Sequence, residues 1–214
     1  MKKIRLLVSM LFLLMLGCSA VDNVPSGYRL NSDANSGVLL ASVSYSGSYA
    51  EHSMLFREVG STKWKKLKVG AQHTLLPPGM LEWDIEKPGL RGQVFAVELP
   101  AGEYEFASWY VGSGVSSTGP VNLFSIRFDI VAGHAVYAGN FHFVKEISRA
   151  VIFARFNVQL ANEFERDAPL ISQKFSALNL EYVDNNVART ESISRLGGGG
   201  ATKVTIPMPV PVNY

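Results

Sequence analysis

Apolar and polar residues alternate through residues 37–158, and this pattern predicts a series of β-strands. In the first strand one face is apolar and the other carries serines: Leu39, Ala41, Val43 and Tyr45 against Ser42, Ser44 and Ser46. Further alternating runs occupy residues 52–59, 62–69, 91–111, 122–144 and 149–158. Because successive side chains of a strand point to opposite faces, such runs indicate strands with one buried side. Since no helical pattern separates them, the region predicts a mainly β fold, an antiparallel β-sandwich.

Two parts of this region have the pattern of a β-hairpin. In the first, Pro100-Ala101-Gly102 separates two arms, which place Phe95, Val97 and Leu99, and then Tyr104, Phe106 and Ser108, on one face each. In the second, Ala132-Gly133 separates residues 122–131 from residues 134–144. A short turn with Pro or Gly between two alternating arms predicts that the arms pair with each other.

The first of these turns carries a family resemblance. Residues 99–106, Leu-Pro-Ala-Gly-Glu-Tyr-Glu-Phe, resemble the P-x-G-x-Y hairpin of transthyretin-like and carboxypeptidase-regulatory-like β-sandwich modules. Residues 128–139 are similar to the following hairpin in uncharacterised bacterial envelope lipoproteins of that build. The resemblance implies a β-sandwich, and it assigns no active-site residue, because such modules share architecture while differing in function.

One helical segment is expected after the strands. Five apolar residues are spaced 4, 7, 4 and 3 apart, which places them on one stripe of a helix: Leu160, Phe164, Ile171, Phe175 and Leu178. Pro169 lies inside this stretch, so the helix either kinks there or divides into two. We expect residues 159–183 to pack on the sandwich as part of the same domain. Residues 184–214, with four consecutive glycines and three alternating prolines, predict a flexible tail.

The single cysteine, Cys18, follows a basic start and a short apolar run. This arrangement resembles a bacterial lipoprotein signal, in which residues 1–17 are removed and Cys18 carries the lipid; an ordinary signal peptide cut near Ala20 is the alternative. The apolar run of residues 6–16 is shorter than the roughly 20 residues that span a bilayer. Residues 18–36 are polar and rich in turn-forming residues, which predicts a flexible tether. We expect a lipid-anchored cell-envelope protein, with Ser19 typical of sorting to the outer membrane, facing the periplasm.

Removal of the leader also changes the charge of the chain. The leader contains three of the 20 basic residues, and the remaining 17 face 18 acidic ones. A nearly neutral protein without a basic excess gives no indication of nucleic-acid binding. With no second cysteine, the fold contains no disulfide of its own.

The candidate ligands for a metal ion are few. His134 and His142 share a strand face but lie eight residues apart, about 26 Å at about 3.3 Å per residue, so they cannot bind one ion. Glu82, Asp84 and Glu86 alternate with apolar residues, and a solvated strand face explains them better than a calcium site. We therefore predict no metal, no cofactor and no catalytic residue.

Two segments are candidates for contact with a partner. Lys63, Lys65, Lys66 and Lys68 surround Trp64, and they either bind anionic head groups or, as we favour, protect a sheet edge from aggregation. Residues 112–120 form a Gly- and Ser-rich loop with Trp109 and Tyr110 at its base.

The function that these patterns favour is a non-catalytic binding or scaffolding module of the envelope. It is held at the membrane by its lipid and contacts an envelope protein or a glycan. The alternative is an envelope hydrolase or a carbohydrate-acting enzyme. A pocket that collects Glu82, Asp84 or His134 would favour that alternative.

Overall fold

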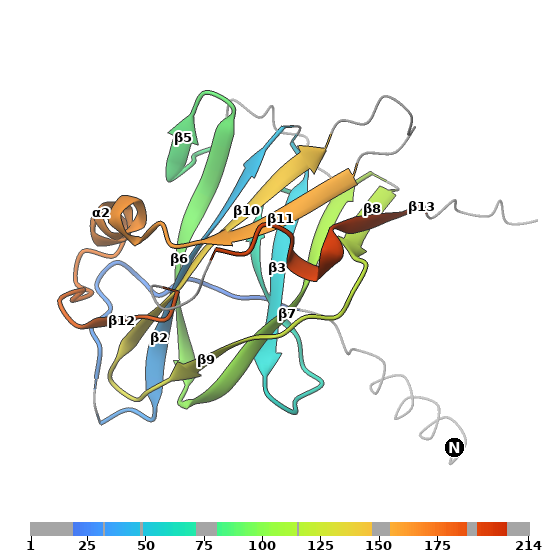
Figure 1. Cartoon of the computed structure of the whole chain (residues 1–214). Helices are drawn as coiled ribbons and strands as arrows, with labels where there is room; N and C mark the ends of the chain where they lie inside the picture. The colour runs from blue at the N-terminus through green and yellow to red at the C-terminus, as the bar shows by residue number, and fades with distance from the viewer. Residues whose placement is uncertain are drawn as a thin grey trace, which may run out of the picture.

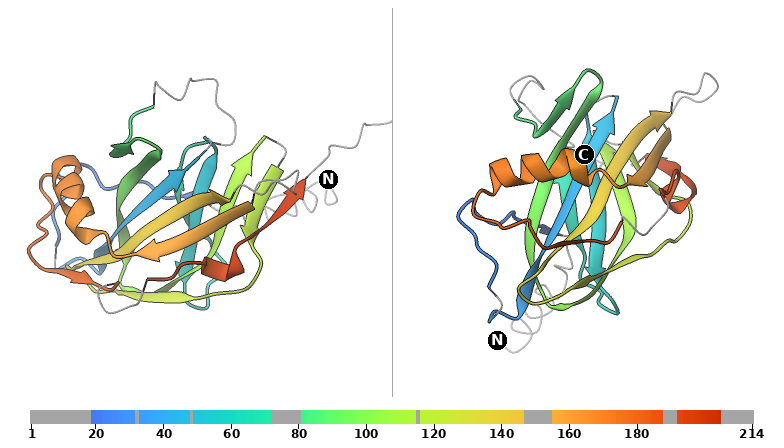
Figure 2. Two further views of the ribbon diagram at one scale, coloured as in Figure 1. Left: turned by 45° about the horizontal axis from the view of Figure 1, so that its top comes forward. Right: turned by 60° about the vertical axis from the view of Figure 1, so that its left-hand side comes forward.

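The structure is a computed structural model, which describes residues 19–31, 33–47, 49–71, 81–114, 116–146, 155–187 and 192–204. The predicted signal peptide, the lipidation site Cys18 and the final residues 205–214 lie outside this description. Two β-sheets pack face to face, and one helix covers the outer side of the second sheet (Figures 1 and 2). The predicted mainly β sandwich with a helix near its C-terminus is confirmed.

The first sheet, sheet A, contains seven strands. Their order is β1 (Ser19–Ala20), β4 (Lys65–Val69), β3 (Glu51–Glu58), β7 (Gly102–Ser113), β8 (Ser116–Pro120) and β13 (Gly200–Val204), and β9 (Ile126–Ile130) also pairs with β7. The second, sheet B, has the order β11 (Arg155–Ala161), β10 (Ala135–Glu146), β2 (Ser36–Ser46), β6 (Leu90–Pro100) and β5 (Ile85–Lys87), and β12 (Val183–Asn185) also pairs with β10.

The middle of sheet B departs from the antiparallel arrangement. Strands β2 and β10 run parallel, with Val38 opposite Ala135 and Ser46 opposite Val144. The pairs β1–β4 and β10–β12 are also parallel, whereas the other strand pairs of the two sheets are antiparallel. The sandwich is therefore mixed, with a parallel pair at the centre of sheet B.

Neither predicted hairpin is formed. Strand β6 belongs to sheet B and β7 to sheet A, so the turn at Ala101 carries the chain from one sheet to the other. The turn at Gly133 likewise joins β9 of sheet A to β10 of sheet B. An alternating pattern with a turn predicts two strands, but it does not identify the neighbour with which each strand pairs.

A β-bulge in β7 decides which of its side chains face outward. Leu55 pairs with Ser108 and Phe56 with Phe106, which leaves Ala107 as an extra residue. Because one extra residue reverses the alternation beyond it, Ser108 lies on the outer face and Trp109 enters the core, where it is 1% exposed. The prediction that Ser108 shares a face with Tyr104 and Phe106 was therefore wrong.

Sheet B is buried on both faces. Toward sheet A it contributes an apolar layer that includes Leu39, Val97 and Phe141. Its outer face packs against the helix α2 (Phe164–Lys174) and the residues that follow it, through contacts of Val38, Leu40 and Ala96 with Ile171, Phe175 and Leu178. The helix is continuous through Pro169. Leu160, which was expected in the helical stripe, belongs to β11 and to the core between the sheets.

Parts of the predicted tether and tail are built into the sheets. Strand β1, which follows directly on Cys18 in the sequence, pairs with β4. The N–H of Val24 then donates to the carbonyl of Ala96 (2.8 Å), so the chain around Val24 lies along the free edge of β6. At the other end, the short 3-10 helix η3 (Leu196–Gly198) and β13 complete sheet A beside β8. Trp109 Nε1 donates to the carbonyl of Leu196 (3.0 Å), which ties the C-terminal segment to the core.

We expect Trp109→Ala to lower the free energy of unfolding by about 3–5 kcal/mol, because it opens a large cavity in the core. Urea unfolding followed by circular dichroism measures the change. Tyr110→Ala, at the neighbouring half-buried position, is the control and should cost less than about 1.5 kcal/mol. A loss below 1 kcal/mol for Trp109→Ala would contradict the bulged register.

A second prediction concerns His52, which is fully buried and stacked on Tyr45 with ring centroids 4.3 Å apart. Burial lowers the pKa of His52 from 6.5 to about 4. Between these values the unfolded chain binds a proton that the folded protein does not, so stability decreases as the pH falls, by about 3 kcal/mol. We expect His52→Phe to reduce the pH dependence of the unfolding free energy between pH 6.5 and 4. If the unfolding free energy changed with pH by the same amount in both proteins, the low pKa of His52 would be contradicted.

Candidate binding site

A groove of about 720 Å³ lies on the outer face of sheet A. We call it the sheet A groove. Arg57 and Trp64 line one part of it, residues of β7 that include Ser108 and Tyr110 another, and residues 117–124 the rest. The groove therefore collects residues from β3, β7, β8 and two connecting segments that are distant in sequence.

The floor of the groove depends on the bulge and on a glycine. Beyond Ala107, the reversed alternation brings Ser108 and Tyr110 to the outer face. The Tyr110 ring then lies against Gly112, where an added Cβ would come within 2.4 Å of the Tyr110 hydroxyl. Only glycine leaves room for the ring to lie along the strand. The result is an aromatic surface on an otherwise polar face.

An ion pair fixes the opposite part of the groove. The Arg57 guanidinium lies 4.5 Å from the centre of the Trp64 ring and binds Glu105 through Nη2 at 2.8 Å. Ser125 Oγ donates to the other oxygen of Glu105 at 2.7 Å. The hydrogen bond from Ser125, which has the larger effect, and the one from Arg57 hold the pKa of the Glu105 carboxyl below its usual value. The groove thus contains charged groups that already compensate each other.

Two apolar side chains project beside the groove. Leu123 is 99% exposed and Val121 is 60% exposed. Their segment is held in place by the backbone, because Val121 N–H donates to the carbonyls of Gly197 and Gly199 and Asn122 N–H to that of Gly197. Leu123 and Val121 border the same groove as Trp64 and Tyr110, and a contiguous exposed apolar patch of this kind marks an interaction surface.

The groove brings together the two contact segments predicted from sequence. Trp64 comes from the lysine-rich segment, and Tyr110 and residues 117–120 from the Gly- and Ser-rich one. One detail of the prediction was wrong, because residues 116–120 form strand β8 instead of a loop. Trp109 borders the groove but is almost completely buried.

The histidines and acidic residues are placed elsewhere. His134 lines a pocket of about 620 Å³ beside Arg29 and Tyr182, whereas His142 contacts Ser44 (2.9 Å) and Ser46 (3.1 Å) on sheet B. Asp84 is held by Lys174 (2.6 Å) and by the N–H of Val94. In the part of the chain that the structure describes, no three His, Cys, Asp or Glu residues are grouped as metal ligands. No helix of those residues is long and apolar enough to cross a membrane.

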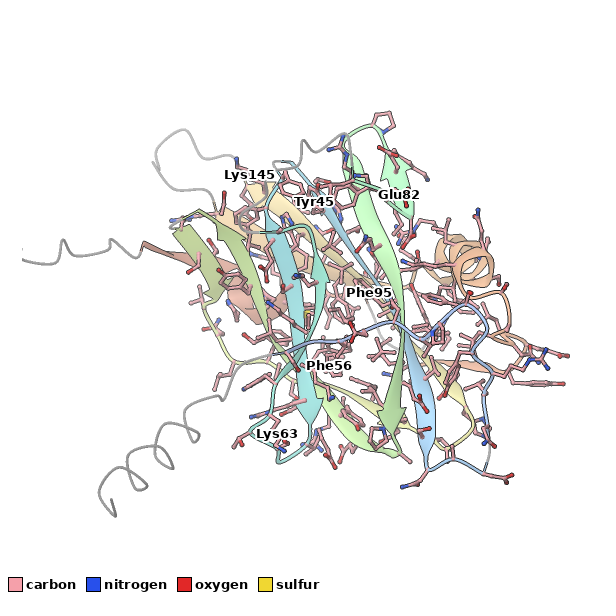
Figure 3. The ribbon with its side chains drawn as sticks, turned by 180° about the vertical axis from the view of Figure 1, so that it is seen from behind. Tyr45, Phe56, Lys63, Glu82, Phe95 and Lys145 are labelled. Atoms are coloured by element: carbon pink, nitrogen blue, oxygen red, sulfur yellow. The ribbon has the colours of Figure 1, made fainter. Side chains whose placement is uncertain are left out.

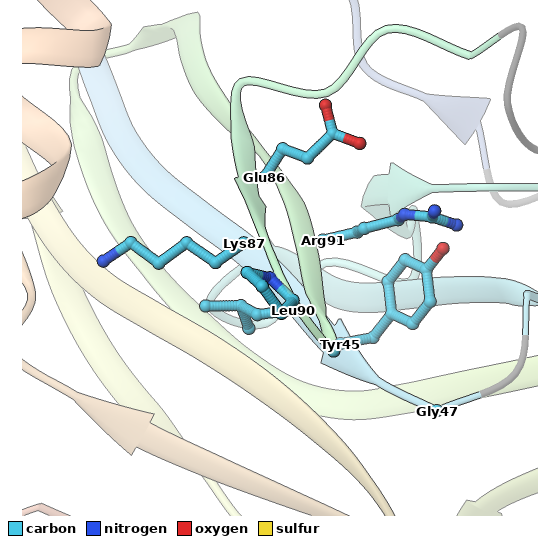
Figure 4. Close-up of a pocket in the computed structure, with 8 residues that line it drawn as sticks. Tyr45, Gly47, Glu86, Lys87, Leu90 and Arg91 are labelled. Carbon is cyan, nitrogen blue, oxygen red and sulfur yellow. The ribbon is translucent and has the colours of Figure 1, made fainter.

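A third pocket, of about 460 Å³, lies at the turn between β5 and β6. Figure 4 shows the Arg91 guanidinium beside the Tyr45 hydroxyl, with Lys87 pointing in another direction. Glu86 also lines this pocket, while Glu82 and Asp84 do not. The predicted row of acidic residues therefore does not act together, because Asp84 is in an ion pair with Lys174 and Glu86 lies at the turn.

A buried polar cluster beneath α2 was missed in the sequence. Asp167 is completely buried and accepts hydrogen bonds from Ser42 (2.5 Å), Tyr137 (2.6 Å) and Arg166 (2.8 Å). Burial, together with the Asp167 carboxylate, raises the pKa of Tyr137. The Ser42 and Ser44 hydroxyls also lie within hydrogen-bond distance of the Asn140 side-chain oxygen, at 2.9 and 3.0 Å. The serines of β2 were expected to face water, but Ser42 and Ser44 are buried beneath the helix. Their small, uncharged side chains were the one indication in the sequence that this face of the strand is buried.

Comparison of the chain with protein-family models, with curated proteins and with solved structures gave no match. The resemblance to transthyretin-like and carboxypeptidase-regulatory-like modules therefore stays a prediction.

We expect Asp167→Ala to lower the free energy of unfolding by about 3–5 kcal/mol, because it leaves Arg166 and two buried hydroxyls without their acceptor. Glu165→Ala, at an exposed position of the same helix, should change stability by no more than about 0.5 kcal/mol. Chemical denaturation of both variants measures the difference. Equal effects would show that the cluster does not hold the helix on sheet B.

Proposed function

We propose that this protein is a lipid-anchored cell-envelope protein whose β-sandwich is a non-catalytic binding module. The sheet A groove is its contact surface. The observation that carries this proposal is the side chain of Leu123, exposed to water beside a groove that contains Trp64, Tyr110 and Arg57. Trp, Tyr and Arg are the residue types that dominate the binding energy of protein interfaces.

The composition of the groove favours a protein partner over a glycan. Leu123 and Val121 offer apolar anchors, and the Arg57–Glu105 pair is already satisfied within the domain. Because the anchoring segment is fixed by backbone hydrogen bonds, binding requires little ordering of the chain. We therefore propose another envelope protein as the partner.

The arrangement of acid and base groups favours binding over hydrolysis. Glu82, Asp84 and His134, which would have to converge in an active site, do not share any of the three pockets described above, because His134 lines one of them without either carboxylate. Asp84 and Asp167 are engaged in ion pairs. In these ion pairs Asp84 and Asp167 stabilise the fold.

A photoreactive residue at position 123 tests the contact surface in intact cells. We expect a discrete cross-linked product from position 123 and none from position 182, where Tyr182 is 75% exposed away from the groove. With the identified partner purified, Leu123→Ser should weaken binding about 30-fold, as expected for a residue worth about 2 kcal/mol, and Tyr182→Ser should leave it unchanged. Equal effects of the two substitutions would contradict the assignment.

The anchor has its own test. We expect the mature N-terminus to be a lipid-modified Cys18, and Cys18→Ser to release the protein from the membrane fraction. Mass spectrometry of the mature protein decides this, since an unmodified chain that starts after Ala20 would overturn the proposed anchor.

A further inference from the structure

The chain next to the proposed lipid site is folded against sheet A. Ser19 and Ala20 form β1 and pair in parallel with Lys65 and Lys66 of β4. Ser19 N–H donates to the carbonyl of Trp64 (3.4 Å), and Val21 N–H to that of Lys66 (3.2 Å). Neighbouring strands lie about 4.8 Å apart, so the chain leaves sheet A directly beside the lysine-rich segment.

This pairing leaves no length of chain for a spacer. The Cα atoms of Cys18 and Ser19 can be only about 3.8 Å apart, because they are consecutive in the chain. A lipid on Cys18 would therefore hold the edge formed by β1 and β4 at the bilayer surface. We infer that this edge, with the exposed Lys63 and Lys68, is the face of the domain that contacts anionic phospholipid head groups. The inference rests on the proposed lipid anchor.

The charges of this edge fit a negative surface. Lys63 and Lys68 are exposed, and Lys63, Lys65 and Lys68 form no ion pair among the residues that the structure describes. Lys66 is paired with Glu51 at 2.7 Å. Residues 61–70 contain four lysines and no acidic residue. From Lys63 to Lys68 the basic segment extends about 16 Å along the strand.

The sequence favoured protection of a sheet edge as the role of these lysines, and the structure gives that role less support. Lysines on an edge strand prevent pairing with another chain. Here β1 already occupies the edge of β4 at Lys65 and Lys66. Backbone pairing thus covers the edge at these two residues, where a lysine is not needed to block it.

The proposed orientation turns the other end of the domain away from the membrane. Figure 3 shows Lys63 at one end of the sandwich and Glu82 and Lys145 at the opposite end. Several acyl chains hold a protein firmly without help, whereas one chain needs a second signal such as a basic patch. On a firmly held lipoprotein, the lysines therefore set orientation more than retention.

The first experiment removes the lipid and measures the surface alone. The mature chain with Cys18→Ser is mixed with vesicles of phosphatidylglycerol and phosphatidylcholine, or of phosphatidylcholine only, and sedimented. We expect binding to the anionic vesicles that decreases with added salt. Each lysine near the surface contributes about fivefold in affinity, so Lys63→Gln with Lys68→Gln should weaken binding about 25-fold. Lys87→Gln with Lys145→Gln, at the opposite end, is the matched control and should change it less than twofold.

The second experiment measures orientation on the anchored protein. In the same anionic vesicles, Lys63 and Lys68 of the lipidated protein should react with an amine reagent at least fivefold more slowly than in detergent, while Lys87 should react equally in both. Equal binding to both kinds of vesicle, or equal loss from both pairs of substitutions, would overturn the inference. The N-terminal mass reports separately on the anchor, so failure of the lipid site and failure of the docking edge are distinguishable.

Discussion

The burial of sheet B on both faces is the constraint on which the rest of the structure depends. Between sheet A and α2, strand β2 and the first seven residues of β10 are buried, and most of their side chains on both faces are apolar. The polar residues that remain there have to be satisfied internally, and Ser42, Tyr137 and Asn140 are satisfied around Asp167. Sheet A, in contrast, has one face left open to solvent, and the groove lies on that face.

The strands could be predicted from the sequence, but their neighbours could not. Alternation along the chain correctly placed Leu39, Val97 and Phe141 in the core between the sheets. The turns at Ala101 and Gly133 have the same local composition whether the chain returns along the same sheet or crosses to the other. Which of these occurs depends on the burial of β2 between β6 and β10, and hence on residues far away in the chain.

The residues of the candidate site could also be predicted from the sequence, but not their arrangement. Trp64 and Tyr110 were recognised separately as contact residues, because aromatic side chains among lysines, glycines and serines stand out in a sequence. Their common groove results from the pairing of β3 with β7 and from the extra residue at Ala107. Without that residue, Trp109 would take the outer position. Asp167 gave no signal, since an acidic residue near the start of a helix is ordinary.

The parallel pairing of β2 with β10 has a consequence for how the chain folds. Val38 of β2 meets Ala135 of β10, almost a hundred residues later in the chain. During synthesis β2 emerges early, and it remains without its two neighbours until first β6 and then β10 have followed. Contacts of such long range slow folding and leave apolar strands open to association with other chains. This strand, whose nine central residues are buried in the finished protein, is therefore open to association with other chains for as long as the chain is incomplete.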